Sequence, residues 1–240
     1  MILRRVIEHV KAQNWTAVAL DFVIVVVGVF IGIQVSNWNA VQHERKREAQ
    51  IVGNLISDLN EIERIANRTA EIYDGRVKSG IRLMTFLRSD AARPADQAQF
   101  EDDLGAVSSA FPAIARSPTI IELLASGNTG LIRDDELRLA IIKFDREMIS
   151  AEAANAGILD LWVKYTEPVT IQATPYFAAS GEGQGYEVVD YDFDIEKMRA
   201  DARLLPALSW LVGLNNAELS FRTNMRDDAI ALRERLEAEQ

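Results

Sequence analysis

The feature that most constrains this chain is an apolar run over residues 17–35, inside the stretch WTAVALDFVIVVVGVFIGIQVSNW (15–38). Its length matches the roughly 20 residues that a helix needs to cross about 30 Å of hydrocarbon. Trp15 and Trp38 flank the run and would lie roughly 34 Å apart along a helix, which suits two interfacial aromatic anchors. The stretch predicts a single transmembrane helix over 15–38.

Two other interpretations of this stretch compete with a retained membrane anchor. A cleaved signal peptide fits poorly, because the apolar run is long and is followed by SNWNAVQHERKR rather than by a small-residue cleavage site. A buried core helix of a soluble protein is the other alternative. We expect a retained anchor.

Polar and small residues in this run share one helical face. Asp21, Val25, Gly28, Gly32 and Ser36 follow one another at steps of 4, 3, 4 and 4. The two glycines form a GxxxG motif, which lets two helix backbones approach closely in lipid. Asp21 and Ser36 on the same stripe would be costly against lipid. The stripe predicts a helix association face, with snorkelling of Asp21 to the nearby interface as the alternative.

The flanks of the run indicate how the chain is oriented. Residues 1–14 predict a short amphipathic N-terminal segment at the membrane surface. The free amino terminus adds positive charge before the run, and Glu44 and Glu48 add negative charge after it. The N-terminal side is therefore the more positive one, which predicts that the N-terminus is inside. We expect a single-pass protein of the inner (cytoplasmic) membrane with a periplasmic or extracytoplasmic C-terminal domain. The basic residues near the two ends are equal in number: Arg4, Arg5 and Lys11 before the run, and Arg45, Lys46 and Arg47 after it.

The charge of the remaining chain excludes some functions. The 240 residues carry a net charge of −10; residues 1–50 hold six basic and four acidic residues, a net of +2, so the remainder carries −12. An acidic domain without a basic stripe predicts no nucleic-acid binding, because phosphate neutralisation supplies most of that affinity. The chain has no cysteine, which excludes disulfides, thiol nucleophiles and cysteine-ligated metals.

Residues 39–88 are predicted to be a stalk helix that continues from the membrane helix. Apolar residues recur there mainly at steps of three and four, and no proline interrupts them. The pattern is close to coiled-coil spacing, so we expect its apolar seam to contribute to self-assembly. The seam residues include Val52, Leu55, Leu59, Ile62 and Tyr73.

The rest of the acidic domain, residues 89–240, divides into helices at prolines and capping residues. Ser117 followed by Pro118 predicts one helix start, and Asp134 predicts the next. Long helices joined by short breaks predict an all-α fold, an antiparallel helical bundle. The expected helices cover about 97–111, a segment from 117, about 134–165 before Pro168, and a segment from about 206 to the end.

Residues 175–195 are expected to form an irregular loop with an extended segment at 186–193. Asp190, Asp192 and Asp194 begin like a calcium loop, but Ile195 occupies the position that requires glycine. We therefore expect no metal there, but a solvated loop that caps the following helix.

The acidic triplet 101–103 is expected to lie near a helix start, where carboxylates favour the positive end of the helix dipole. Four aromatic residues at helical spacing are expected to pack in the core: Trp162, Tyr165, Trp210 and Phe221.

No catalytic constellation is apparent. His9 and His43 each lie beside a membrane end, without a serine or aspartate pattern that suggests a triad. GEGQG (181–185) lacks the lysine and the strand–helix context of a phosphate loop. We expect no cofactor and no enzymatic activity.

The chain resembles a family of uncharacterised bacterial single-pass membrane proteins, a domain of unknown function. The resemblance rests on Asp21, Gly28, Gln34 and Asn37-Trp38-Asn39, and on LLASGNTGLIRDDELRLAI (123–141). Aspartate replaces the more familiar glutamate at position 21. The resemblance implies the membrane-helix, stalk and helical-domain architecture and assigns no activity.

Three functions remain open. The first is a membrane-anchored scaffold or interaction protein that forms a homo-oligomer through the Asp21/Gly28/Gly32 face and the stalk seam. The second is an ion-coupled or transport-accessory subunit, in which a buried Asp21 carboxylate serves a multi-pass membrane partner. The third is a receptor whose helical domain binds a small ligand; it would need a separate partner for signalling.

Overall fold

The computed structural model describes residues 15–109, 114–179 and 185–238. Contacts between Cα atoms divide the chain into two units, Met1–Ile51 and Val52–Gln240. The expected amphipathic segment over residues 1–14, with His9, lies outside the described residues.

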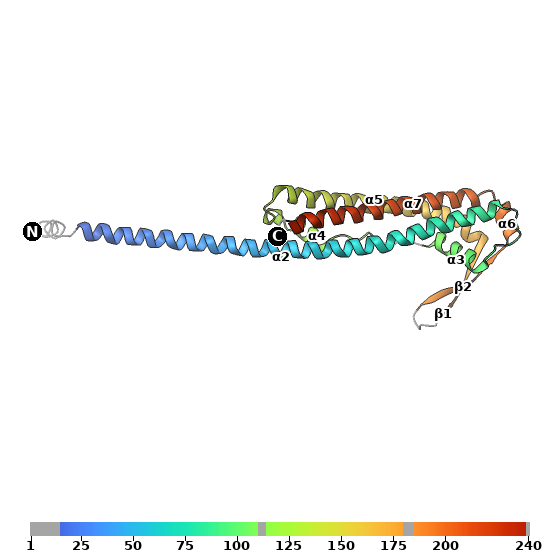
Figure 1. Ribbon diagram of the computed structural model, residues 1–240, viewed down its shortest axis with the longest axis horizontal. Helices are drawn as coiled ribbons and strands as arrows, with labels where there is room; N and C mark the ends of the chain where they lie inside the picture. Colours follow the sequence, from blue (N-terminus) through green and yellow to red (C-terminus); the bar gives the residue numbers. More distant parts are fainter. Residues whose placement is uncertain (1–14, 110–113, 180–184, 239–240) are drawn as a thin grey trace, which may run out of the picture. The chain divides into compact units, whose positions relative to one another are not determined.

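The described chain is almost entirely helical, which confirms the all-α fold class (Figure 1). Within residues 15–109, 114–179 and 185–238, two short strands follow α5 and form one two-stranded sheet. In chain order the elements are α2 (Trp15–Arg88), α3 (Gln97–Ser108), α4 (Pro118–Ala125), the 3-10 turn η1 (Asn128–Leu131), α5 (Asp135–Gln172), β1 (Ala173–Ala179), β2 (Tyr186–Phe193), α6 (Ile195–Ala200) and α7 (Leu204–Ala238).

The described part of the first unit belongs to helix α2, which is long and apolar enough to cross a membrane. Among the described residues, the apolar side chains of this part of α2 are exposed, and Trp38 is 63% exposed. A contiguous exposed apolar surface is typical of a site that contacts a membrane or another protein. The exposed side chains include Phe22, Val23, Ile24, Val25, Val26, Val27, Val29, Phe30, Ile31, Ile33 and Val35.

In the second unit, α7 runs antiparallel to α2. Arg233 near the end of α7 donates a hydrogen bond of 2.6 Å to Asn60 Oδ1 and forms a salt bridge with Glu63. Val212 near the start of α7 packs against Gly80, much later in α2. Increasing residue numbers on one helix therefore meet decreasing numbers on the other.

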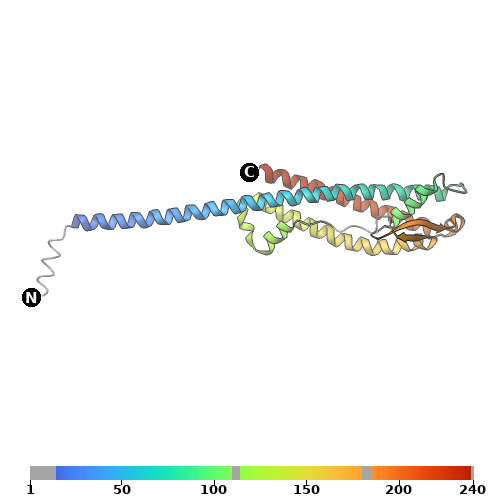
Figure 2. The same ribbon diagram turned by 90° about the horizontal axis from the view of Figure 1, so that it is seen from below.

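Helices α3 and α4 follow α2 in the chain and precede α5, and each contacts a different part of α2. Figure 2 shows the helices from a second direction. Arg82 Nε donates to Asp103 Oδ2 of α3 at 2.8 Å. Asp58 Oδ2 accepts hydrogen bonds from Ser117 Oγ at 2.7 Å and from Thr119 N at 3.0 Å, at the start of α4. Since α3 lies beside the end of α2 and α4 beside its earlier part, this part of the chain runs back along α2.

The capping residues expected from sequence are confirmed. Ser117 Oγ accepts from Ile120 N at 3.1 Å, and Asp134 Oδ1 accepts from Leu137 N at 2.6 Å. Two helix ends differ from the expectation: α3 ends at Ser108 rather than near residue 111, and α5 continues through Pro168 to Gln172. Pro168 removes one backbone hydrogen bond, but Thr166 and Val169 on either side of it are buried, so this part of α5 is packed against the domain.

Two apolar cores hold the bundle together. The distal core lies where α2 ends, and the proximal core lies beside the earlier part of α2. The distal core contains Leu83, Leu87, Phe100, Leu104, Val107, Val169, Ala173, Met198, Leu204, Leu208 and Leu211. The buried apolar side chains of the proximal core include Val52, Leu55, Leu59, Ile62, Ile120, Leu123, Ile132, Leu137, Ile141, Phe144, Met148, Met225, Ala229, Leu232 and Leu236.

A polar layer separates these cores. Between the two cores, the buried side chains of α2 and α7 are mostly polar. Among the described residues of α5, none between Met148 and Thr166 is fully buried. The polar layer consists of Thr69, Tyr73, Arg76 and Ser79 on α2, and of Asn215, Glu218 and Arg222 on α7.

The stalk seam is buried within the second unit itself. Leu55, Leu59 and Tyr73 are 0% exposed, and Val52 and Ile62 are also buried. The expectation that this seam joins separate copies of the chain stays a prediction, but its side chains are already buried within a single copy.

Within the stretch 175–195, the described residues 175–179 and 186–193 lie in two paired strands instead of an irregular loop. The extended segment expected at 186–193 is confirmed as β2, but its partner β1 was missed. The strands are antiparallel, with Ala173 opposite Phe193, and a bulge interrupts the register between Tyr176 and Phe177. Pro175 obscures the strand in the sequence, and a two-stranded sheet tolerates it because each strand has an open edge.

Candidate functional site

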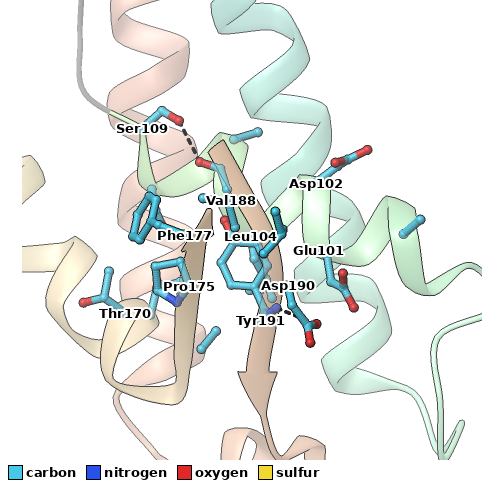
Figure 3. A pocket seen from close by; sticks show the side chains of 17 residues that line it. Glu101, Asp102, Leu104, Ser109, Thr170, Pro175, Phe177, Val188, Asp190 and Tyr191 are labelled. Carbon is cyan, nitrogen blue, oxygen red and sulfur yellow. Dashed lines mark hydrogen bonds between the residues drawn. The ribbon is translucent and has the colours of Figure 1, made fainter. Parts of the chain in front are cut away.

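A groove of about 590 Å³ lies between α3 and the β-hairpin. Its walls come from one side of α3, the end of α5 and both strands (Figure 3). Such a volume is typical of sites for small molecules. The groove lies entirely within the second unit.

The floor of the groove is apolar. Leu104, Val169 and Ala173 line it and belong to the distal core, so the floor is rigidly packed from below. Phe177 on β1 adds an aromatic side chain that is 63% exposed. The groove therefore presents apolar surface to solvent above a well-packed core.

Tyr191 reaches α3 across the groove because position 105 is glycine. A methyl group at Gly105 would lie 2.7 Å from Tyr191 Oη, closer than packed atoms approach. Burial raises the pKa of Tyr191, and the nearby carboxylates of Asp102 and Glu101 raise it further. The tyrosine hydroxyl thus lies in a locally negative environment.

Three carboxylates line the groove without a neutralising partner. Glu101 Oε1 accepts a hydrogen bond of 2.8 Å from Gln97 Nε2, and Asp190 Oδ1 accepts one of 2.8 Å from Tyr191 N. Within the described ranges, Glu101, Asp102 and Asp190 form no salt bridge, and no Lys, Arg or His lines the groove. The groove therefore has a negative charge that no basic side chain among its described lining residues balances.

The acidic triplet 101–103 does not lie in the first turn of its helix, so the expected explanation by the helix dipole is wrong. Asp96 caps α3 by accepting from Gln99 N at 3.0 Å, and the first turn of α3 holds no acidic residue. Asp103, which is 2% exposed, pairs with Arg82 on α2. Of the triplet, Glu101 and Asp102 are the two that line the groove, and Figure 3 labels both.

The polar layer is a second site with unusual electrostatics. Arg222 Nη2 lies 3.0 Å from Glu218 Oε2, and both side chains are 1% exposed. The Tyr73 ring lies near two guanidinium groups, with its centroid 5.7 Å from Arg222 Cζ and 5.3 Å from Arg76 Cζ. Both distances suit cation–π interactions. A desolvated ion pair of this kind costs free energy unless its partners hold it in place.

Burial dominates the titration of this layer. It raises the pKa of Glu218 despite the opposing charge of Arg222. It also raises the pKa of Tyr73 to about 12, with a further contribution from the Glu218 carboxylate and opposing contributions from Arg222 and Arg76. The layer therefore favours a neutral tyrosine strongly.

We expect the wild-type protein to lose stability relative to a Tyr73→Phe variant as the pH rises from 10 to 12. The folded state keeps the Tyr73 proton up to a pKa of about 12, whereas the unfolded chain releases it at the ordinary value of 10.0. This stabilisation is complete below the unfolded pKa and is lost as the pH rises through the folded one.

The relative loss should reach about 1 kcal/mol near pH 11. Guanidinium chloride unfolding of both full-length proteins in detergent, at about pH 9, 10 and 11, measures it. A difference in unfolding free energy that stays constant over this range would contradict the prediction.

The remaining residues predicted from sequence occupy separate places. Asp194 caps α6 by accepting from Glu196 N at 3.0 Å and from Lys197 N at 3.2 Å, which confirms the capping interpretation. These backbone hydrogen bonds and Lys197 lower the pKa of Asp194. The membrane association face and the anchors Trp15 and Trp38 belong to the first unit, whereas the groove belongs to the second.

Sequence reasoning missed both the groove and the polar layer. The signal that could have found the layer is Glu218 with Arg222 at a spacing of four residues, on the side of the last helix that also carries Leu211 and Met225. No protein-family model matches the chain, and no curated protein or solved structure matches it.

Proposed function

We propose that this protein is a membrane-anchored, homo-oligomeric scaffold or interaction protein with no catalytic activity of its own. Residues 15–38 anchor it in the bacterial inner membrane as a single pass, and the acidic helical domain lies on the periplasmic side. The observation that carries the proposal is the exposed apolar surface of α2 from Phe22 to Val35, in a chain whose stalk seam is buried within its own helical domain.

The membrane face is the proposed self-association surface. A methyl group placed on Gly28 or Gly32 would have no heavy atom within 4 Å, so this side of the helix is open to a neighbouring helix. Small residues at this spacing favour close helix packing in lipid. Burial of the stalk seam leaves the Gly28/Gly32 face as the self-association surface in this proposal.

We expect Gly28→Leu to weaken self-association roughly tenfold, because a branched side chain would hold the two backbones apart. Val26→Leu is the matched control, since it adds bulk at a similar depth on the opposite helical face. Mass photometry of complexes extracted gently from the native membrane measures the oligomer size. Equal effects of the two substitutions would count against the proposed face.

Mass spectrometry of the same preparation tests the competing role. Stoichiometric recovery of a multi-pass membrane protein would replace the scaffold by the transport-accessory subunit. In that case Asp21→Asn should abolish the ion-driven function, because a carboxamide cannot carry the proton. In a simple scaffold the same substitution should leave the oligomer assembled.

A further inference from the structure

We propose that the groove between α3 and the β-hairpin is a binding site for a small organic cation with an apolar body. The inference goes beyond the scaffold role and does not depend on how the chain associates in the membrane. It rests on the size, the lining and the unbalanced charge of the groove.

The apolar part of the ligand is specified by the floor. The surface formed by Leu104, Val169, Pro175 and Phe177 offers an aromatic ring and aliphatic groups on neighbouring elements. Figure 3 shows Phe177 and Pro175 together on one side of Tyr191. The volume of about 590 Å³ lies within the range of sites that enclose a single small molecule.

The positive charge of the ligand is specified by the acidic wall. Glu101 and Asp102 on α3 and Asp190 on β2 lie on the other side of Tyr191 in the same view. After burial, the charges of Asp102 and Glu101 also raise the pKa of Tyr191, so both carboxylates contribute negative potential at the tyrosine hydroxyl. A bound ammonium or amidinium group would neutralise this wall and face the Tyr191 ring.

The chain offers no internal cation for this wall among its described residues. Arg82 is a basic side chain that pairs with α3, but it binds Asp103 on the side of α3 that faces α2. A like-charged cluster that is otherwise left unpaired favours a cationic occupant and disfavours an anionic one. Charge complementarity therefore selects the class of ligand.

The test compares phenethylamine, a small aromatic cation, with the neutral 2-phenylethanol and the anionic 3-phenylpropanoate. Isothermal titration calorimetry on the full-length protein in lipid nanodiscs measures binding. We expect saturable binding of phenethylamine that is at least about fivefold tighter than binding of the alcohol, with the carboxylate weakest. Equal binding of the amine and the alcohol, or no saturable binding of the amine, would overturn the proposal.

Two variants locate the site. The triple variant Glu101→Gln/Asp102→Asn/Asp190→Asn should lose the preference for the cation. Ala98→Trp should weaken binding at unchanged charge, because it places a large side chain in the acidic end from an exposed position of α3. Preference retained in the triple variant would overturn the assignment to this groove.

A charge-matched control separates local from long-range electrostatics. Glu71→Gln/Asp160→Asn/Glu234→Gln removes the same charge from exposed positions on α2, α5 and α7, and should keep the preference for phenethylamine. Equal loss in both triple variants would show a general field effect and overturn the site. Circular dichroism of each variant checks that the helical domain remains folded.

Discussion

The Arg222→Met variant should lose about 3 to 5 kcal/mol of the free energy of unfolding, the largest effect expected of any single substitution in this chain. Arg222 and Glu218 are both almost completely buried and lie 3.0 Å apart. Methionine retains the length and apolar surface of the arginine stem but leaves the Glu218 carboxylate buried without its cation. Burial raises the pKa of Glu218 although Arg222 and Tyr73 both lower it, so the carboxylate is disfavoured even before its cation is removed.

The double variant Glu218→Leu/Arg222→Met distinguishes the loss of the ion pair from the loss of side-chain packing. Removing both charges also removes the desolvation cost, so the double variant should be close to wild type in stability or above it. Arg235→Met, at an exposed position later in α7, should change stability by less than about 0.5 kcal/mol. Guanidinium chloride unfolding of the full-length proteins in detergent, followed by circular dichroism, measures all three. A small loss in Arg222→Met would refute the role of the pair.

Gly80→Ala should destabilise the protein by about 1 to 3 kcal/mol, because the new methyl group would overlap Cγ2 of Val212 on α7. Valine has a stiff side chain, and Cγ2 of Val107 lies 3.5 Å from the same point, so the site has little room to relax. This loss is the net effect after the gain of about 1 kcal/mol that alanine brings to a helix interior. Thermal unfolding of the full-length protein measures it.

Gly75→Ala is the matched control for that experiment. A methyl group on Gly75 of α2 would have no heavy atom within 4 Å, so alanine there should stabilise the helix by up to about 1 kcal/mol. Adding Val212→Ala to Gly80→Ala should recover part of the loss by removing the overlapping methyl. If Gly80→Ala behaves like Gly75→Ala, the close approach of α2 and α7 is incorrect.

The elements that follow from short-range rules could be predicted from sequence. Ser117, Asp134 and Asp194 cap helices as expected, because capping depends on a side chain and the backbone within three residues. The periodicity of α2 likewise predicted which of its side chains are buried. Periodicity does not state what buries them, so it could not show that the seam is already buried within a single copy of the chain.

The parts that depend on tertiary contacts could not be predicted. Glu101 and Asp102 acquire a groove only because the hairpin lies beside α3, many residues later in the chain. Trp210 and Phe221, expected in the core, are 51% and 36% exposed, because they lie at the edge of the packed face of α7. Trp210 instead stacks on Tyr165 with ring centroids 5.1 Å apart.

The division of the bundle into two cores affects how the domain responds to a local disturbance. Helices α2, α5 and α7 pass through both cores, but the buried apolar side chains of one core are separated from those of the other by the polar layer. Opening of the distal core therefore costs its own packing and leaves the proximal side chains buried. Local opening at the groove end should therefore cost less free energy than unfolding of the whole domain.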